Sequence, residues 1–250
     1  MNKAAIKTLE ILEYLSALPQ GGAGISEISR ALDLPKSSVS EILYTLLFKD
    51  YVQYDNEPMK TFRLGLKAAQ LGFSAIGRMD VLQAARPMLE LLHTETGYTV
   101  LLTVENNGRA LIIDKLEQKS AVQLSAAVGS AYPMHLTAAG KAILAMHTWE
   151  EVLSIVGEGC YEVHTVHSIS NQYSLQTALA KVREQGYAEE NLEENEYTCS
   201  IAAPIFDHSG RVCAAVSVSL LASDCEKTDF DCLIGKVLRC AKHISAAMGA

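Results

Sequence analysis

The sequence lacks a long hydrophobic run, since no uninterrupted apolar stretch approaches the roughly 20 residues that a membrane-spanning helix needs. Hydrophobic residues make up 49% of the 250 positions and charged residues 20%, which excludes a disordered chain. The N-terminal segment 1–15 places polar side chains at positions 3, 7, 10 and 13 between apolar ones. This pattern predicts an amphipathic helix and not a signal peptide, so we expect a cytoplasmic protein.

The first half of the chain has no cysteine, and no two cysteines form a C-x-x-C pair. This distribution favours reduced, mostly buried thiols over disulfides or a zinc knuckle. The six cysteines are Cys160, Cys199, Cys213, Cys225, Cys232 and Cys240.

Motifs of the common catalytic sites are also absent. Gly140-Lys141 is not a phosphate-binding loop, because His135 stands where the first glycine belongs and Ala142 where Ser or Thr should bind magnesium. The sequence has no G-x-S-x-G elbow, and no Ser or Cys lies in a sequence context that identifies it as an activated nucleophile. His164-x-x-His167 has a spacing compatible with a metal but no nearby Cys or Asp. The sequence therefore predicts neither an enzyme nor a bound cofactor.

The net charge of −8 is unevenly distributed along the chain. Residues 1–75 hold 8 Lys/Arg and 8 Asp/Glu, whereas residues 76–250 hold 13 and 21. The acidic run Glu189, Glu190, Glu193, Glu194 and Glu196 is more typical of a solvated edge than of paired catalytic carboxylates. An acidic body repels DNA and a neutral segment does not, so a duplex should meet the neutral segment 1–75.

Residues 34–54 contain a helical pattern that could read DNA. Val39, Ile42, Leu43 and Leu46 recur at the i, i+3, i+4, i+7 spacing and define one buried stripe. The opposite face carries Ser37, Glu41, Tyr44 and Phe48, of which the first three are short or polar enough to meet base edges. This segment alone is equally compatible with a plain amphipathic helix.

The flanking segments favour the DNA-binding interpretation. We expect a helix over 3–18, a loop at 19–24, and a short helix over 27–32 with Ser26 as its N-cap. A tight turn at 33–35 then leads into the longer helix, which is the helix-turn-helix arrangement. Strands at 51–54 and 61–64 around a turn at 55–58 predict a two-stranded wing, on which Lys60 and Arg63 would lie near phosphates.

The N-terminal segment 1–75 resembles that of the IclR family of bacterial transcription regulators. The matching segments are AIKTLEIL at 5–12, ISEISRALDLPKSSVSEILYTL at 25–46, DYV at 50–52 and FRLG at 62–65. The segments DVLQAARPMLELLHTETGYTVLL at 80–102 and VGSAYPMHLTAAGKAILA at 128–145 match the family's effector domain. The resemblance implies a winged helix-turn-helix domain at 1–65, a linker helix at 66–79 and a GAF-like effector-binding domain at 80–250.

The resemblance also implies which residues contact DNA. Lys36 and Ser37 at the start of the helix suit phosphates, and Glu41 replaces the Arg of many relatives and can accept a hydrogen bond from cytosine N4. The expected DNA-binding residues are Ser26, Lys36, Ser37, Ser38, Ser40, Glu41, Tyr44, Lys60 and Arg63.

The second half of the chain combines strands joined by turns with helices on both flanks, which predicts an α+β domain with a mostly antiparallel sheet. Asn106-Asn107-Gly108 is a strong hairpin signal, Pro87 is expected to bend its helix, and residues 149–170 have no clear pattern. The expected helices cover 66–77, 80–96, 173–185 and 227–248, with a further one opening at 137–140; the expected strands cover 98–105, 109–116, 121–126, 186–195, 200–210 and 212–221.

The small residues Thr137 to Gly140 open a helix whose free N–H groups could bind a carboxylate. Tight packing of the helix against a sheet would require the same small residues. The resemblance favours a ligand site. This sequence departs from the family there: Glu190 stands where the family usually has Asp, Ser200 where Cys is common, and Tyr197 where Gly is usual. A carboxylate at Glu190 would oppose an anionic effector unless it were protonated or bonded to a ligand hydroxyl. The implied effector-binding residues are Leu124, Tyr132, Ala138, Ala139, Gly140, Glu190, Ser200, Ser217 and Ser219.

Together with these patterns, the resemblance implies an effector-responsive transcription regulator of a catabolic operon, by default a repressor because repression is the family's commoner mode. Its expected partners are a double-stranded DNA operator, a small organic acid or aromatic metabolite, and further copies of itself in a homodimer or tetramer. No membrane, metal or cofactor is expected. The alternative is a metabolite-binding GAF-like protein or an enzyme whose N-terminal head serves only dimerisation.

Overall fold

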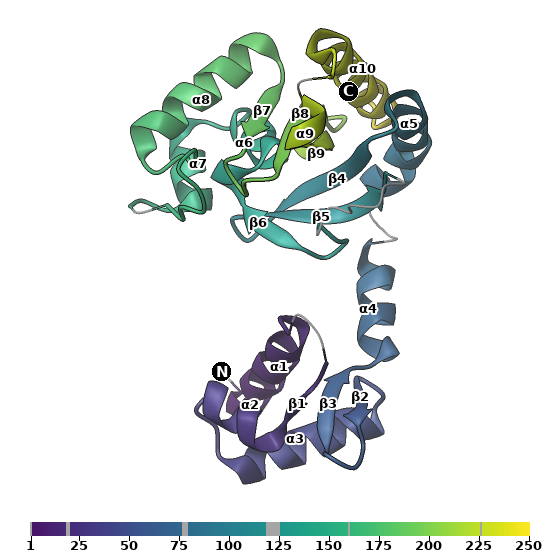
Figure 1. The fold of residues 1–250 in the computed structure, drawn as a ribbon, viewed down its shortest axis with the longest axis vertical. Helices are drawn as coiled ribbons and strands as arrows, with labels where there is room; N and C mark the ends of the chain where they lie inside the picture. Colours follow the sequence, from purple (N-terminus) through teal and green to yellow (C-terminus); the bar gives the residue numbers. More distant parts are fainter. Residues whose placement is uncertain (1, 19–20, 77–79, 119–125, 160, 226) are drawn as a thin grey trace. The chain divides into compact units, whose positions relative to one another are not determined.

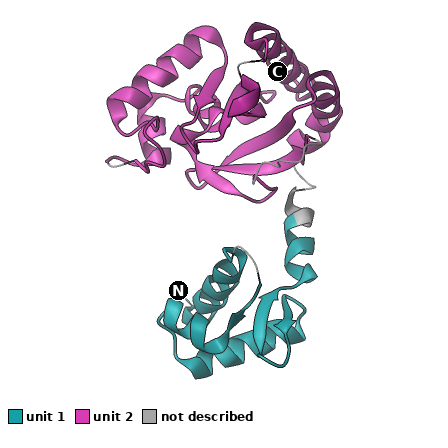
Figure 2. Cartoon of the chain, in the orientation of Figure 1, with its two compact units in different colours: residues 1–78 teal, residues 79–250 magenta. Residues whose placement is uncertain are grey.

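The computed structural model describes the chain apart from residues 1, 19–20, 77–79, 119–125, 160 and 226, and apart from the side chains of 73–76. The chain forms two compact units, residues 1–78 and residues 79–250 (Figure 2). Each unit has its own buried hydrophobic cluster. Among the described helices, none has the length and apolar character needed to span a bilayer.

The first unit contains the predicted helix-turn-helix. Ile11, Ile28, Val39, Leu43 and Phe62 are fully buried in its core, so the apolar stripe of the third helix faces inward as expected. The elements of this unit are α1 Lys3–Ser16, β1 Ala23–Gly24, α2 Ile25–Ala31, α3 Lys36–Phe48, β2 Val52–Asn56, β3 Thr61–Leu64 and α4 Leu66–Ile76 (Figure 1).

Both predicted strands of the wing are present as β2 and β3, and among the described residues β1 adds a third strand, in the order β1-β3-β2. The loop expected only to break the first helix ends in β1, where Ala23 pairs with Phe62. Gly22 makes this approach possible, because a Cβ there would lie 2.6 Å from the Phe62 carbonyl oxygen. The N-cap prediction was wrong: Gly24 precedes α2, and Ser26 lies within the first helical turn.

Gly65 ends the Phe-Arg-Leu-Gly segment at a point of close backbone contact. A Cβ at this position would collide with the Asp50 carbonyl oxygen, and the Gly65 N–H donates to the Tyr51 oxygen at 2.8 Å. Asp50 has a positive φ of 63°, a conformation in which Asp is more common than most residues. The glycine therefore joins the end of the wing to the turn after α3.

The second unit is an α+β domain, as predicted. Its elements are α5 Asp80–Thr96, β4 Thr99–Asn106, β5 Arg109–Leu116, β6 Ala131–Pro133, the 3-10 turn η1 Met134–Leu136, α6 Ala138–Leu144, α7 Trp149–Val156, α8 Gln172–Gln185, β7 Ala188–Asn191, β8 Thr198–Phe206, β9 Val212–Leu221, α9 Ala222–Cys225 and α10 Phe230–Ala247.

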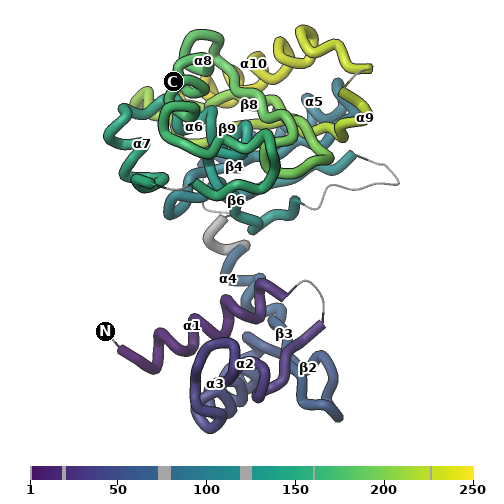
Figure 3. The backbone as a smooth tube through the Cα atoms, turned by 60° about the vertical axis from the view of Figure 1, so that its left-hand side comes forward, coloured from purple at the N-terminus to yellow at the C-terminus, as the bar shows by residue number. Residues whose placement is uncertain are grey.

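The six strands described in this unit form one antiparallel sheet in the order β6-β5-β4-β9-β8-β7. On one face, α6 packs on β8 and β9, as Figures 1 and 3 show, and joins α8 in a core around Ala142 and Ile143. On the other side, α5 and α10 pack together and against the sheet. Because both faces are covered, β9 is buried along most of its length.

Several predicted boundaries in this unit were wrong. The strand expected over 186–195 is limited to β7, because Gly186 caps α8 in the left-handed conformation and Leu192 has a φ of 58°. The C-terminal helix begins later than expected, after the N-cap Asp229. The segment without a clear pattern contains α7. This helix begins with a capping box formed by Thr148 and Glu151, and its first residue, Trp149, packs on the core. The strand expected at 121–126 lies almost wholly outside the described residues.

Candidate functional site

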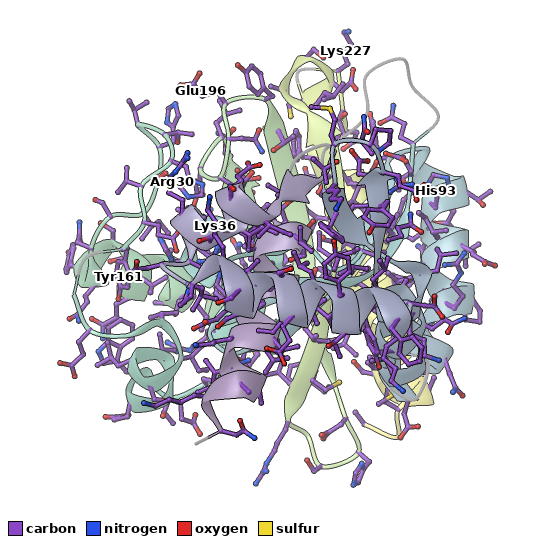
Figure 4. The ribbon with its side chains drawn as sticks, turned by 90° about the horizontal axis from the view of Figure 1, so that it is seen from below. Arg30, Lys36, His93, Tyr161, Glu196 and Lys227 are labelled. Carbon is purple, nitrogen blue, oxygen red and sulfur yellow. The ribbon has the colours of Figure 1, made fainter. Side chains whose placement is uncertain are left out.

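One candidate site is the exposed face of α3. Lys36, Ser37 and Glu41 are exposed, and Figure 4 shows Lys36 at the start of this helix. Tyr44 is 40% exposed, and its ring meets the Phe62 ring edge-on at a centroid distance of 6.1 Å. The wing therefore holds the Tyr44 ring in place at the surface of α3.

The two remaining serines of α3 are less accessible. Ser38 and Ser40 are half-buried, and Ser38 lies with Glu41 in a shallow groove that Lys7 and Thr8 of α1 complete. Glu41 thus borders both the exposed face of α3 and its junction with α1.

The wing carries both predicted cations at its surface. Lys60 is exposed at the turn between β2 and β3 and has a φ of 51°. Arg63 is exposed on β3, with its Nε 3.8 Å from a carboxylate oxygen of Asp55. Since Asp55 offsets part of the Arg63 charge, Lys60 is the less compensated of the two.

A second candidate site is a cavity in the second unit, between α6 and the sheet. It has a volume of about 90 Å³, or about 650 Å³ with its open mouth included. A pocket of this kind holds a small molecule. Its lining consists of Leu101, Thr103, Ala110, Ile112, Ala126, Tyr132, Thr137, Ala138, Ala139, Glu190, Glu194, Asn195, Thr198, Ser200, Ser217 and Ser219.

The sheet side of the cavity presents a row of hydroxyl groups. Ser217 and Ser219 lie two apart on β9 and are almost fully buried, so both hydroxyls face the same side. The Ser219 hydroxyl lies 2.9 Å from that of Ser200, its direct partner on β8. Thr103 of β4 is equally buried. These hydroxyls can both donate to and accept from an oxygen-rich ligand.

Glu190 of β7 supplies a buried carboxyl group to the same cavity. It pairs with Ser200 of β8, and the residue is only 4% exposed. Its Oε1 accepts the backbone N–H groups of Glu193 and Glu194 at 2.8 and 3.3 Å. Burial raises the pKa of Glu190 to about 7, against the opposing effect of these two hydrogen bonds. The expectation of a solvated acidic edge was therefore wrong at this residue.

The start of α6 forms the opposite wall, through Ala138 and Ala139. The Thr137 hydroxyl caps the helix by accepting the Gly140 N–H at 3.0 Å. Gly140 itself is absent from the lining, and a Cβ there would overlap the Met134 backbone. Of the two explanations for this run of small residues, close packing accounts for Gly140.

A buried ion pair lies beside the cavity. The Lys141 ammonium of α6 donates to both carboxylate oxygens of Glu193 at 2.6 Å, and Lys141 is only 3% exposed. Thr165 donates to the Leu192 carbonyl oxygen at 2.6 Å, and Ser168 donates to that of Glu193 at 2.7 Å. The segment 192–195 is thus fixed from three sides at the edge of the cavity.

The structure brings seven of the nine predicted effector residues together in the lining, and Gly140 is not among them. Leu124 lies outside the described residues. Sequence reasoning missed several polar lining residues, among them Thr103, Thr198 and Asn195. Alternation along a strand could have grouped Thr103 with Leu101, but it could not show which face of β4 meets the cavity. No three metal-ligating side chains gather within the described part of the chain.

Both units of the chain match known protein families. Residues 4–56 match the model of the IclR helix-turn-helix domain, and residues 73–246 match that of the bacterial transcriptional regulator IclR C-terminal domain. The chain belongs to the IclR family. It is accordingly a DNA-binding transcription regulator with an effector domain, as expected.

Individual members of the IclR family align over nearly the whole chain. The HTH-type transcriptional repressor AllR of Salmonella typhi is 34% identical over 247 residues, which cover 99% of this chain and 90% of AllR. The structure of Thermotoga maritima IclR has a TM-score of 0.79 at 26% identity and covers 98% of both chains. An IclR homologue from Microbacterium hydrocarbonoxydans, solved with 4-hydroxybenzoate, has a TM-score of 0.81 at 21% identity and covers 98% of this chain and 99% of its own.

Proposed function

We propose that this protein is a cytoplasmic repressor that binds a double-stranded operator as a homodimer or tetramer and responds to a small molecule in the cavity. The observation that carries this proposal is that one chain combines an exposed α3 face with a separate, polar cavity of ligand size. Its 34% identity to a repressor over nearly the full length supports repression as the mode of regulation. The regulated genes would be those of a catabolic operon.

In this proposal the chain divides at residues 65 and 79 into a DNA-binding domain, a linker helix and an effector domain. Ser37, Glu41 and Tyr44 would read base edges, while Lys36 and Lys60 would contact phosphates. A homodimer would place two α3 helices on the half-sites of a pseudo-palindrome. Ser26, Ser38, Ser40 and Arg63 would contribute secondary contacts to the DNA backbone.

The effector would bind between α6 and the hydroxyl row of the sheet. Tyr132, Ala138, Ala139, Glu190, Ser200, Ser217 and Ser219 are the proposed contacts. A small organic acid or aromatic metabolite fits the cavity volume, and the homologue that contains 4-hydroxybenzoate supports this size class. The effector would act by binding one arrangement of the two DNA-binding domains more tightly than another. No chemical step is required of the protein.

A gel-shift experiment on the protein's own upstream region tests the proposal. The wild type should shift this DNA specifically, and the triple variant Ser37→Ala, Glu41→Ala, Tyr44→Ala should lose the shift. A matched control replaces the exposed Glu150, Glu158 and Tyr173 of the second unit by alanine and should bind like the wild type. The absence of any specific shift, or unchanged binding by the α3 variant, would favour the alternative of a metabolite-binding protein whose head serves dimerisation.

A further inference from the structure

The described lining of the cavity has no positively charged side chain. It holds the carboxylates of Glu190 and Glu194, the hydroxyls of Thr and Ser residues, one Tyr and one Asn, and it has no Lys, Arg or His. An anionic ligand therefore finds no positively charged side chain to pair with among these residues. The energy of placing an anion beside a buried carboxylate is unfavourable, because the low dielectric strengthens their repulsion.

The cation adjacent to the cavity is already neutralised. Lys141 of α6 attracts Glu190 electrostatically, but both Glu193 oxygens hold its ammonium at 2.6 Å. Lys141 is not part of the lining and borders a separate pocket instead. It cannot turn to a ligand without leaving the buried Glu193 carboxylate unpaired.

The two oxygens of Glu190 have different surroundings. Oε1 accepts two backbone N–H groups, whereas Oε2 has no hydrogen-bond partner among the described residues. Oε2 is therefore free to bond a ligand. The charged and titratable groups around Glu190 are Lys141 on α6, Glu193 and Glu194 on the following segment, the Cys199 thiol on β8 and, across the cavity, Tyr132 on β6.

We propose that Glu190 selects the ligand by charge: the cavity takes a neutral or cationic molecule that donates a hydrogen bond to Oε2, and it takes a carboxylate only together with a proton on Glu190. This inference rests on the proposed effector site and specifies the chemistry of its ligand. It refines the expectation of a small organic acid, since such an acid would bind with proton uptake.

The direction of the pH effect follows from which atom donates. An ionised Glu190 accepts from a hydroxyl, amide or ammonium group of the ligand, so such a ligand needs no added proton. A carboxylate needs Oε2 to carry a proton and donate it in a hydrogen bond. Burial raises the pKa of Glu190 to about 7, so the proton must come from solvent at higher pH. The affinity for a carboxylate should then fall about tenfold for each pH unit above neutral.

Calorimetric titration with acid and amide pairs of the same shape tests the proposal. The probes are 4-hydroxybenzoate with 4-hydroxybenzamide, and lactate with lactamide, at pH 6 and pH 8 in buffers of different ionisation enthalpy. For a pair that binds, the amide should be at least about tenfold tighter than the acid at pH 8, and the acid should bind with proton uptake. Glu190→Gln should remove both the uptake and the pH dependence. A carboxylate that binds equally tightly at both pH values without proton uptake would overturn the proposal.

Glu189→Gln is the matched control. Glu189 neighbours Glu190 on β7 but points to the other side, where it bonds Lys181 at 2.7 Å. Its replacement should leave the acid-to-amide preference unchanged. If it abolished the preference as Glu190→Gln does, general acidity of the region and not Glu190 would be responsible.

A titration without ligand keeps the proposal testable if none of the four probes binds. The ¹³C carboxyl signal that disappears in Glu190→Gln should titrate near neutral pH, whereas a midpoint at the ordinary value of about 4.3 would overturn the proposal. Gel shifts separate this inference from the proposed function. A failure of the wild type to bind its operator would contradict the repressor role. The preference of the cavity for ligands of one charge would still be measured by the calorimetry and the titration.

Discussion

Lys141 and Glu193 form a buried ion pair in which the ammonium lies 2.6 Å from both carboxylate oxygens. The pair joins α6, whose first residues line the cavity, to the segment that follows β7. Segment 192–195 also provides the two N–H groups that Glu190 accepts. One ion pair therefore helps to hold both walls of the cavity in position.

Lys141→Met should destabilise the second unit strongly. The substitution keeps the apolar stem but leaves the Glu193 carboxylate buried without its partner, a change that typically costs about 3–5 kcal/mol. Urea denaturation followed by circular dichroism would measure the loss. Lys181→Met is the control, because the Lys181–Glu189 pair has the same kind of contact at 2.7 Å but is exposed and should contribute at most about 1 kcal/mol. Equal effects of the two variants would contradict the burial argument.

The stability of the second unit should decrease between about pH 4.5 and pH 7 through Glu190. Its pKa is raised from 4.5 to about 7 in the folded protein, so folding favours the protonated form. The stabilisation is complete below the unfolded pKa and is lost as pH rises through the folded one, a change on the order of 3 kcal/mol. Glu190→Gln keeps an acceptor for the two N–H groups and should flatten this part of the curve. Melting temperatures from pH 4.5 to 8 would test it, and parallel curves for the two proteins would refute it.

Gly140→Ala should destabilise the second unit although alanine favours helices. The added Cβ would overlap the Met134 backbone, which can move only if η1 and α6 separate, so a loss of roughly 2 kcal/mol or more is expected. Gly235→Ala in α10 is the control, because no atom lies within 4 Å of its Cβ position. It should stabilise by about 0.5–1 kcal/mol through helix propensity. Thermal denaturation of both variants compares the two effects.

Lys36→Ala should weaken DNA binding without changing sequence preference. A phosphate contact carries charge but no sequence information, so affinities for specific and random DNA should fall together. The slope of the logarithm of the binding constant against the logarithm of the salt concentration should become smaller in magnitude by about one. Glu41→Ala should behave differently, relaxing preference at one base pair with little change in the salt slope. Fluorescence anisotropy with labelled duplexes at several salt concentrations distinguishes these outcomes, and identical behaviour of the two variants would argue against both roles.

Local patterns were sufficient to predict most of the first unit. The positions of Val39, Leu43 and Leu46 follow from helical periodicity, which depends only on neighbours within the helix. Strand β1 could not be predicted in this way. It is very short, and it exists because Gly22 lets the chain approach Phe62, a contact between segments that lie far apart in the sequence.

The cavity was predicted mainly by resemblance, because its residues come from distant strands and helices. Local pattern placed Ser217 and Ser219 on one face of β9, but it could not show which face meets α6. The burial of Glu190 was missed for a similar reason. A run of glutamates looks solvated in sequence, yet β8 and segment 192–195 enclose this one carboxyl group while Glu189 stays at the surface.

Trp149 allows the fluorescence of the second unit to be measured separately from that of the first. It is the single tryptophan of the chain, and it packs against the core of the second unit. Emission excited selectively at tryptophan therefore comes from the second unit alone, while the first unit contributes only tyrosine. A fluorescence denaturation curve can thus be assigned to the effector domain in the intact chain, without cutting the protein in two.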